Sequence, residues 1–132
     1  MSDTDKEKYN SITKKVDDCP DYVIDCLIGK NILKKKATLD TKNLTANISF
    51  KSNYTTKNPV FSPTTRWGHG GKFIHMFGIS LYYNESEDGK SYNYIAKINN
   101  DCISKSPNPL SASMRAILKY IGINNITYQV EK

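Results

Sequence analysis

Residues 108–121 constrain the fold most, because they carry the signals of both ends of an amphipathic helix. Asn108 can cap the first turn, Pro109 fits the first helical position, and Gly122 follows the end. Between these residues the apolar positions recur every three or four residues and form one stripe: Leu110, Met114, Ile117, Leu118 and Ile121. We therefore expect a helix here whose stripe is buried.

Alternating apolar and polar residues predict several short strands. The clearest segment is 43–50, where Leu44, Ala46, Ile48 and Phe50 would face one side, and 36–39 is its expected partner across a turn at 40–42. Further strands are predicted at 79–83 and 92–98, joined by a hairpin loop over 84–89, and at 126–130.

Two shorter helices are also predicted. One spans 19–28, with Asp18 as its cap, Pro20 in its first turn and Gly29 closing it, and the other spans 70–77. The long loop 51–66, rich in Pro, Ser and Thr, precedes the second helix and is a functional candidate.

These elements favour an α+β fold: a small, mostly antiparallel sheet with two to three helices packed on one face. The length of 132 residues suits one domain, which we place at 18–132, behind a polar and flexible tail at 1–17. No apolar run is long enough to span a bilayer, and the first residues lack a signal-peptide core. We therefore expect a soluble, intracellular protein without a membrane partner.

The net charge is +6 and the pI about 9.2, and much of the excess lies in the Lys30–Lys42 region. A solvated surface is the simpler interpretation, and a contact with nucleic acid through this region is the alternative. The three Cys include no close pair, and the two His lie far from them in sequence, so neither a disulfide framework nor a metal site is predicted. No cofactor is expected.

The segment 61–81 concentrates rare residues: the only Trp of the chain, both His and one of its two Arg. A Gly pair at the start of a helix can free backbone N–H groups for a phosphate, hydroxyls can bind a ribose, and Trp67 offers a stacking plane. The other Arg, Arg115, flanks the apolar stripe of 108–121, from where its guanidinium could reach a pocket edge or extend into water. Because the two Arg fall in these two segments, whereas the other basic residues of the chain are Lys, we expect both segments to form one site. The candidate ligand-binding residues are Ser62, Thr64, Thr65, Arg66, Trp67, His69, Gly70, Gly71, Lys72 and Arg115.

Structural explanations of the same residues remain open. Trp67 could be a core residue, the Gly pair could serve a tight turn, and His69 could bond a loop carbonyl. Three tyrosines could supply further pocket walls, although ordinary sheet aromatics are the simpler interpretation: Tyr82, Tyr92 and Tyr94.

Catalysis is disfavoured. His69 could act as a base towards nearby hydroxyls (Ser62, Thr64, Thr65 or Ser80), but no acidic residue stands near it in the sequence. We therefore predict no catalytic residues and a protein that is not an enzyme, with a hydrolase as the weaker alternative.

Two blocks resemble the phage NinX-like family: Phe61-Ser62-Pro63-Thr64-Thr65-Arg66-Trp67 with Gly70-Gly71, Ile74 and Gly78-Ile79, and the block from Asn108 to Arg115. A weaker match is the helix ending in Gly, here Cys19–Gly29. The family often has an acidic residue where Arg66 stands and a Pro where Lys72 stands, so this version is more basic. The resemblance implies a bacteriophage or prophage origin and, with it, the host cytoplasm as the place of action.

Three functions follow as hypotheses. The first is a phage accessory protein, acting against host defence, which binds and sequesters a small phosphorylated, nucleotide-like signalling molecule without catalysis, as a homo-oligomer. The second is a nucleic-acid-binding phage regulator, and the third is a protein that blocks a host enzyme by contact.

Overall fold

The computed structural model describes residues 9–48 and 60–131. The elements, in chain order, are β1 (Tyr9–Lys15), the 3-10 turn η1 (Val16–Asp18), α2 (Asp21–Asn31), β2 (Ala37–Asp40), β3 (Thr45–Ile48), α3 (Trp67–Met76), β4 (Ser80–Glu85), β5 (Tyr92–Ile98), β6 (Cys102–Ser106), α4 (Pro109–Tyr120) and β7 (Asn125–Glu131).

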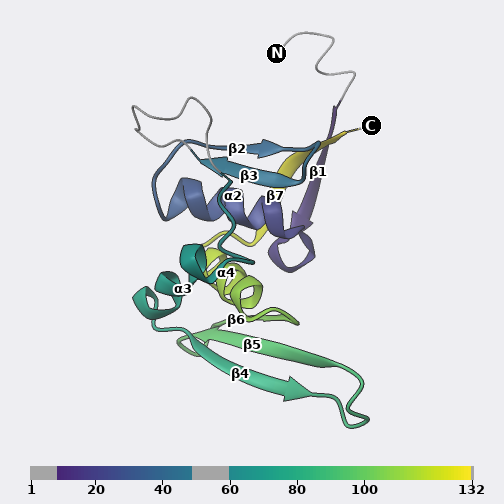
Figure 1. The fold of residues 1–132 in the computed structure, drawn as a ribbon, viewed down its shortest axis with the longest axis vertical. Coiled ribbons are helices and arrows are strands. Elements are labelled where there is room, and N and C mark those ends of the chain that lie inside the picture. The colour runs from purple at the N-terminus through teal and green to yellow at the C-terminus, as the bar shows by residue number, and fades with distance from the viewer. Residues whose placement is uncertain (1–8, 49–59, 132) are drawn as a thin grey trace.

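The elements stack in layers around α2 and α4 (Figure 1). The β2–β3 hairpin lies over α2, α2 packs on α4, and the antiparallel sheet β4–β5–β6 lies on the other side of α4. The strands β1 and β7 pair along one side of the molecule. The two central helices therefore bury apolar side chains on more than one face.

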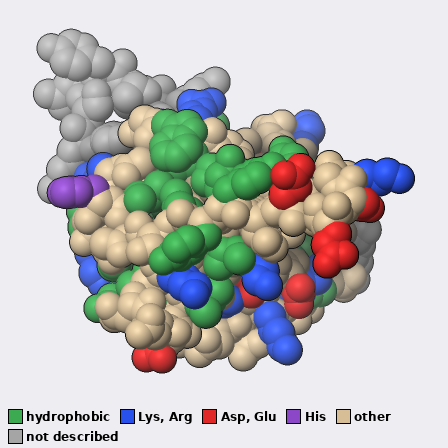
Figure 2. All heavy atoms as spheres, turned by 90° about the horizontal axis from the view of Figure 1, so that it is seen from below, with side chains coloured by type: hydrophobic (Ala, Val, Ile, Leu, Met, Phe, Trp, Pro, Cys, Tyr) green, Lys and Arg blue, Asp and Glu red, His purple; other side chains and the backbone are tan. Residues whose placement is uncertain are grey.

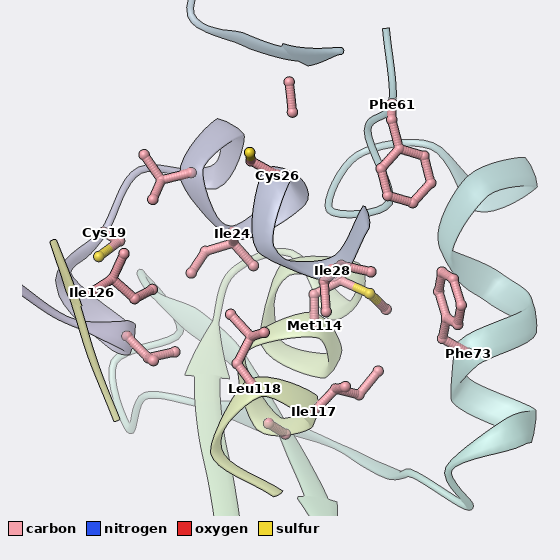
Figure 3. Packing of buried hydrophobic residues seen from close by; sticks show 14 of the residues in the cluster. Cys19, Ile24, Cys26, Ile28, Phe61, Phe73, Met114, Ile117, Leu118 and Ile126 are labelled. Atoms are coloured by element: carbon pink, nitrogen blue, oxygen red, sulfur yellow. The ribbon is translucent and has the colours of Figure 1, made fainter. Parts of the chain in front are cut away.

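The core forms where these layers meet. Figure 3 shows Phe61 and Phe73 pointing toward the side chains of α2 and α4, among them Ile28 and Met114. Phe73 and Met114 are fully buried and Phe61 nearly so. The conspicuous 61–81 segment thus contributes part of the core as well as part of the surface.

Over residues 9–48 and 60–131, the predicted α+β class is confirmed, with three helices and antiparallel strands. In this part of the chain, the strands form three small sheets of two, two and three strands rather than one sheet. Figure 2, which views the molecule from the side of β4–β5–β6, shows hydrophobic side chains at the surface between Lys and Arg side chains.

The chain start differs from the expected tail over 1–17. Residues 9–15 form β1, which pairs with β7 over its whole length, and Val16 is fully buried. A lone Ile12 among polar residues gives no strand periodicity, because the pairing with distant β7 and not a local pattern fixes this strand. Residues 1–8 lie outside the described residues.

The first helix runs further than predicted. Pro20 is its N-cap in place of Asp18, and the helix continues past Gly29 to Asn31. Gly29 does not end the helix but lets it approach β3, since a Cβ there would lie 2.9 Å from the side chain of Ile48. A glycine in the sequence can therefore mark either the end of a helix or a place where a helix packs closely against a neighbouring strand.

The hairpin at 36–50 is confirmed where it is described. Ala46 and Ile48 are buried as predicted, whereas Leu44 has a positive φ of 56° and is exposed in the turn. Phe50 and most of the predicted loop 51–66 lie outside the described residues. The strand β6 was not predicted, because its alternation is short and directly follows the turn after β5.

Candidate functional site

The helix α3 starts at Trp67, three residues before its predicted start. The backbone carbonyl of Arg66 accepts from the N–H groups of His69 and Gly70, at 3.0 Å each, and so closes the first turn. Gly70 and Gly71 therefore lie inside α3 and are not the free helix start that the sequence suggested. The exposed start of the helix is formed by Arg66, Trp67 and Gly68.

Gly70 has a packing function. A Cβ on Gly70 would lie 2.2 Å from the carbonyl oxygen of Pro63, so α3 and the loop before it touch backbone to backbone. A Cβ on Gly71 would meet only the Trp67 ring, at 3.5 Å, which is an ordinary contact. A side chain is therefore excluded by close packing at Gly70 but not at Gly71.

We expect Gly70→Ala to lower the free energy of unfolding by about 1–3 kcal/mol or more, because backbone must move to admit the methyl group. Gly71→Ala is the matched control, in which better helix propensity without a clash gives an unchanged or slightly higher stability. Urea unfolding followed by circular dichroism measures both. Equal stability of the two variants would contradict the close approach.

The loop before α3 is tied to α2 by a buried carboxylate. Asp25 accepts from the backbone N–H of Thr64 at 2.9 Å and from its hydroxyl at 3.0 Å, and Ser62 Oγ lies 3.5 Å from the same side chain. Burial of Asp25 raises its pKa from 3.8 to about 7, against these hydrogen bonds. Thr64 is fully buried. The hydroxyls of Ser62 and Thr64 therefore hold the loop on α2 through Asp25 and are not presented to a ligand. A short hydrogen bond also joins the hydroxyls of Ser62 and Thr65.

His69 holds the same loop from the other side. The backbone N–H of Ser62 donates to Nδ1 of His69 at 3.0 Å, and the imidazole stacks on Phe61 with ring centroids 5.7 Å apart. Burial, with Arg66 and Lys72 nearby, lowers the pKa of His69 below its usual value of 6.5. The ring is therefore neutral at pH 7 and uses Nδ1 as an acceptor.

Arg115 is placed differently from what we expected. Its guanidinium donates to Ser111 Oγ at 3.1 Å, to the carbonyls of Val16 at 2.5 Å and Cys19 at 2.7 Å, and to Asp21 at 2.9 Å. It is 7% exposed. These bonds fasten α4 to the chain between β1 and α2. The N–H donors of Arg115 that could bind a ligand are thus used in hydrogen bonds within the protein.

The residues of the motif that reach the surface are Thr65, Arg66, Trp67 and Lys72. Trp67 is 59% exposed, so the core explanation of this residue is wrong. Lys72 lies beside its neighbour Phe73, with Nζ 5.3 Å from the ring centroid. Of the ten predicted residues, these four remain available to a ligand most directly.

A groove of about 690 Å³ joins the two conspicuous segments of the sequence. Thr65 and Trp67 contribute from the first segment, and the start of α4 contributes from the second. Its lining residues are Thr65, Trp67, Tyr83, Tyr92, Tyr94, Pro107, Asn108, Pro109 and Leu110. The two segments meet through the beginning of α4, not through Arg115 as predicted.

Strand register explains the tyrosines. On the β4–β5 hairpin, Leu81 lies opposite the buried Ala96. Two positions further along β4, Tyr83 lies opposite Tyr94, and after two more positions Glu85 lies opposite Tyr92. Residues opposite or two apart share a face of the sheet. The tyrosines therefore continue the buried face beyond the start of α4, where none of the described helices covers them. Tyr82 points to the opposite face, and Tyr83 was not anticipated as a pocket residue.

Two helices begin at this groove, since Trp67 opens α3 and Pro109 opens α4. Neither first turn contains an acidic residue. Asn108 Oδ1 accepts from the N–H groups of Leu110 and Ser111, as predicted for a cap, whereas no side chain of the described residues caps α3. The positive ends of two helix dipoles therefore face one aromatic groove, and the start of α3 is the uncapped one.

Within residues 9–48 and 60–131, no group of three or more His, Cys, Asp or Glu side chains is arranged to hold a metal ion. In the same part of the chain, no helix is long and apolar enough to cross a membrane.

Comparison with known proteins identifies a relationship over most of the chain. A family described as "Bacteriophage P22, NinX" has a model that matches residues 15–120, a range that includes α2, the motif before α3, the β4–β5 hairpin and α4. No match is found among curated proteins.

Proposed function

We propose that this protein, which belongs to the Bacteriophage P22 NinX family, is a phage accessory protein that binds a small nucleotide-like molecule. The protein would sequester this molecule and would not cleave it. In the host cytoplasm, removal of such a signalling molecule would act against host defence. The proposal includes a homo-oligomer, which would enclose the ligand further.

The exposed Trp67 at the uncapped start of α3 carries the proposal. An exposed indole ring can stack on a base, and base–aromatic stacking contributes about 1–3 kcal/mol. A helix start without a capping side chain or an acidic residue presents N–H groups and a positive dipole end to an anion. Base plane and phosphate donors thus lie next to each other.

Arg66 adds the charge. Its exposed side chain precedes Trp67 in the chain, and a guanidinium can bind two phosphate oxygens at once. Thr65 lines the groove and can reach a ribose hydroxyl. The remaining predicted residues support this site from behind: Thr64, Ser62 and His69 hold the loop, Gly70 allows its close approach, and Arg115 anchors α4.

Binding without cleavage is favoured by the partners of the reactive groups. An acidic side chain, Asp25, does reach the hydroxyls of the motif, but its oxygens accept from Thr64 and Ser62. Nδ1 of His69 accepts from a backbone N–H. Among the described residues, no hydroxyl donates a hydrogen bond to His69, as a Ser–His–Asp relay would require.

Trp67 makes the test simple, because the only Trp of the chain reports on the site by its fluorescence. We expect a panel of cyclic nucleotides and ADP-ribose derivatives to contain a ligand that changes this fluorescence, with a dissociation constant confirmed by calorimetry. Arg66→Ala and Trp67→Ala should each weaken binding about tenfold or more, from the loss of a charge-assisted hydrogen bond or of stacking.

Lys42→Ala is the matched control, since this exposed lysine lies on the β2–β3 turn, away from the groove. It should bind the ligand like the unchanged protein. Unchanged calorimetric heats with every member of the panel, on folded protein, would refute the proposal. If Lys42→Ala instead lowers affinity for a single-stranded oligonucleotide in a salt-dependent way, the nucleic-acid alternative is favoured.

A further inference from the structure

The groove is lined by aromatic rings and prolines, and none of its described lining side chains is charged. Tyr83 is 57% and Tyr92 51% exposed, comparable to Trp67. Because burying an aromatic ring is favourable, a cluster of rings left in solvent within one groove marks a binding surface. The groove is larger than a phosphate at the start of α3 would need, and its described walls carry no charge. We therefore expect a second, largely uncharged ligand in this groove.

The tyrosine wall is braced by its own contacts. The rings of Tyr83 and Tyr94 lie 5.5 Å apart at 65°, those of Tyr92 and Tyr94 lie 6.4 Å apart at 88°, and those of Tyr83 and Tyr92 stack at 5.9 Å. The strands beneath them are paired residue by residue. An occupant would therefore meet rings that are already held in place, at little further cost in side-chain entropy.

Each polar side chain of the groove can donate a hydrogen bond, and the hydroxyls can also accept one. The indole N–H of Trp67 can only donate, and the tyrosine and Thr65 hydroxyls can donate. Asn108 uses Oδ1 to cap α4, so its NH₂ group is what it can offer to an occupant. A partner that is rich in acceptors and poor in donors matches such a surface.

We propose that this groove binds a proline-rich segment of another protein in the polyproline II conformation. Proline lacks a backbone N–H, so such a segment presents carbonyl acceptors and almost no donors. Its backbone carbonyls make no internal hydrogen bonds. Its flat apolar rings pack on aromatic faces, and its conformation is pre-set, which lowers the entropy cost of binding.

Other peptide modes fit less well. A β-strand would need an open sheet edge, whereas the groove lies between the face of the β4–β5 hairpin and the starts of α3 and α4. An amphipathic helix would need a broad aliphatic surface, and Leu110 is the one aliphatic side chain among the described lining residues.

The proposal does not rest on nucleotide binding. It shares only Trp67 and Thr65 with the nucleotide site, so a nucleotide stacked on Trp67 would compete with the peptide. Arg66 separates the two functions, because it is not among the residues that line the groove.

The test uses the full chain and fluorescence anisotropy with a fluorescein-labelled decaproline peptide, beside a Gly-Ser peptide of equal length. Decaproline should bind and the Gly-Ser peptide should not. Tyr83→Ala and Tyr92→Ala should each weaken binding roughly tenfold or more, as expected for aromatic residues at the centre of an interface. Arg66→Ala should leave peptide binding unchanged.

Tyr82→Ala is the matched control, because Tyr82 is similarly exposed at 52% but points to the other face of the same hairpin. It should bind decaproline normally. As a measurement that needs no variant, decaproline should shift the single indole N–H resonance of Trp67 in an NMR spectrum of the ¹⁵N-labelled protein.

Equal binding of the two peptides, an equal loss in Tyr82→Ala and Tyr83→Ala, or an unmoved indole resonance would each overturn the proposal. So would Tyr83-dependent binding of oligothymidylate without binding of decaproline, which would assign the rings to single-stranded nucleic acid. Loss of nucleotide binding in Arg66→Ala with intact decaproline binding would support both sites independently.

Discussion

Arg115→Met is expected to lower the free energy of unfolding by about 3–5 kcal/mol, enough to leave a small domain largely unfolded. The substitution removes four hydrogen bonds, among them those to the buried carbonyls of Val16 and Cys19. Asp21 keeps the hydrogen bond from Ser111 Oγ at 2.6 Å, and the carbonyl of Val16 keeps the N–H of Cys19 at 3.3 Å, so the loss falls mainly on the carbonyl of Cys19 and on the packing of the guanidinium. Buried acceptors that lose their partner cost more than the net value of the bond. Urea unfolding followed by circular dichroism measures the loss.

Lys119→Met is the matched control, one turn later on α4. Lys119 also reaches back to the chain start, with Nζ 2.6 Å from Asp17 and 2.7 Å from the carbonyl of Ile103, but its side chain is 22% exposed, against 8% for that of Arg115. An exposed ion pair contributes about 0–1 kcal/mol, so this variant should stay folded. If Arg115→Met is as stable as Lys119→Met and fails only in ligand binding, Arg115 belongs to the binding site after all, as the sequence suggested.

Local patterns predicted the parts of the fold that depend on local chemistry. The helix at 108–121 was anticipated almost to its ends, because Asn108, Pro109 and Gly122 act within one turn of their own position. The β2–β3 and β4–β5 hairpins followed from alternation and short connections. The strand β1 did not, since its partner β7 is more than a hundred positions away.

The site was predicted by composition more than by geometry. Arg66 and Trp67 were chosen because they are rare in this chain, and both are exposed at one helix start. Rarity does not distinguish a ligand-binding arginine from one that fastens a helix, so Arg115 was assigned to the same site. The available signal in the sequence was the position of Arg115 directly after Met114 of the apolar stripe. This position indicated a buried arginine that binds other parts of the chain.

Asp25 shows why the rest could not be read from the sequence. It stands on the first helix, 39 residues before Thr64, and a single polar residue beside an apolar stripe is compatible with a surface position. Only the packing of the loop on α2 makes it a buried acceptor. The tyrosine wall has a similar origin: alternation predicts which tyrosines share a face, but not that α4 begins too late to cover them.

The buried Asp25 makes stability depend on pH in a direction that is unusual for an aspartate. Its pKa is about 7 in the folded chain and 3.8 in the unfolded chain, so between these values the folded state binds a proton that the unfolded state releases. The contribution of the protonated carboxyl is fully present below pH 3.8 and is lost as the pH rises to about 7. At 1.36 kcal/mol per pH unit, the change amounts to roughly 4 kcal/mol.

Asp25→Asn should remove this dependence, because the neutral amide keeps an acceptor for the N–H of Thr64 and cannot ionise. Relative to the unchanged protein, the variant should gain up to roughly 4 kcal/mol of stability between pH 4 and pH 8, measured by urea unfolding at several pH values. Asp88→Asn is the control: this exposed carboxylate has a pKa lowered by hydrogen bonds to Ser86 and Lys90, so it is already ionised throughout that range. Parallel profiles of Asp25→Asn and the unchanged protein would show that Asp25 is ionised in the folded chain, and the loop before α3 would then be held by a buried charge.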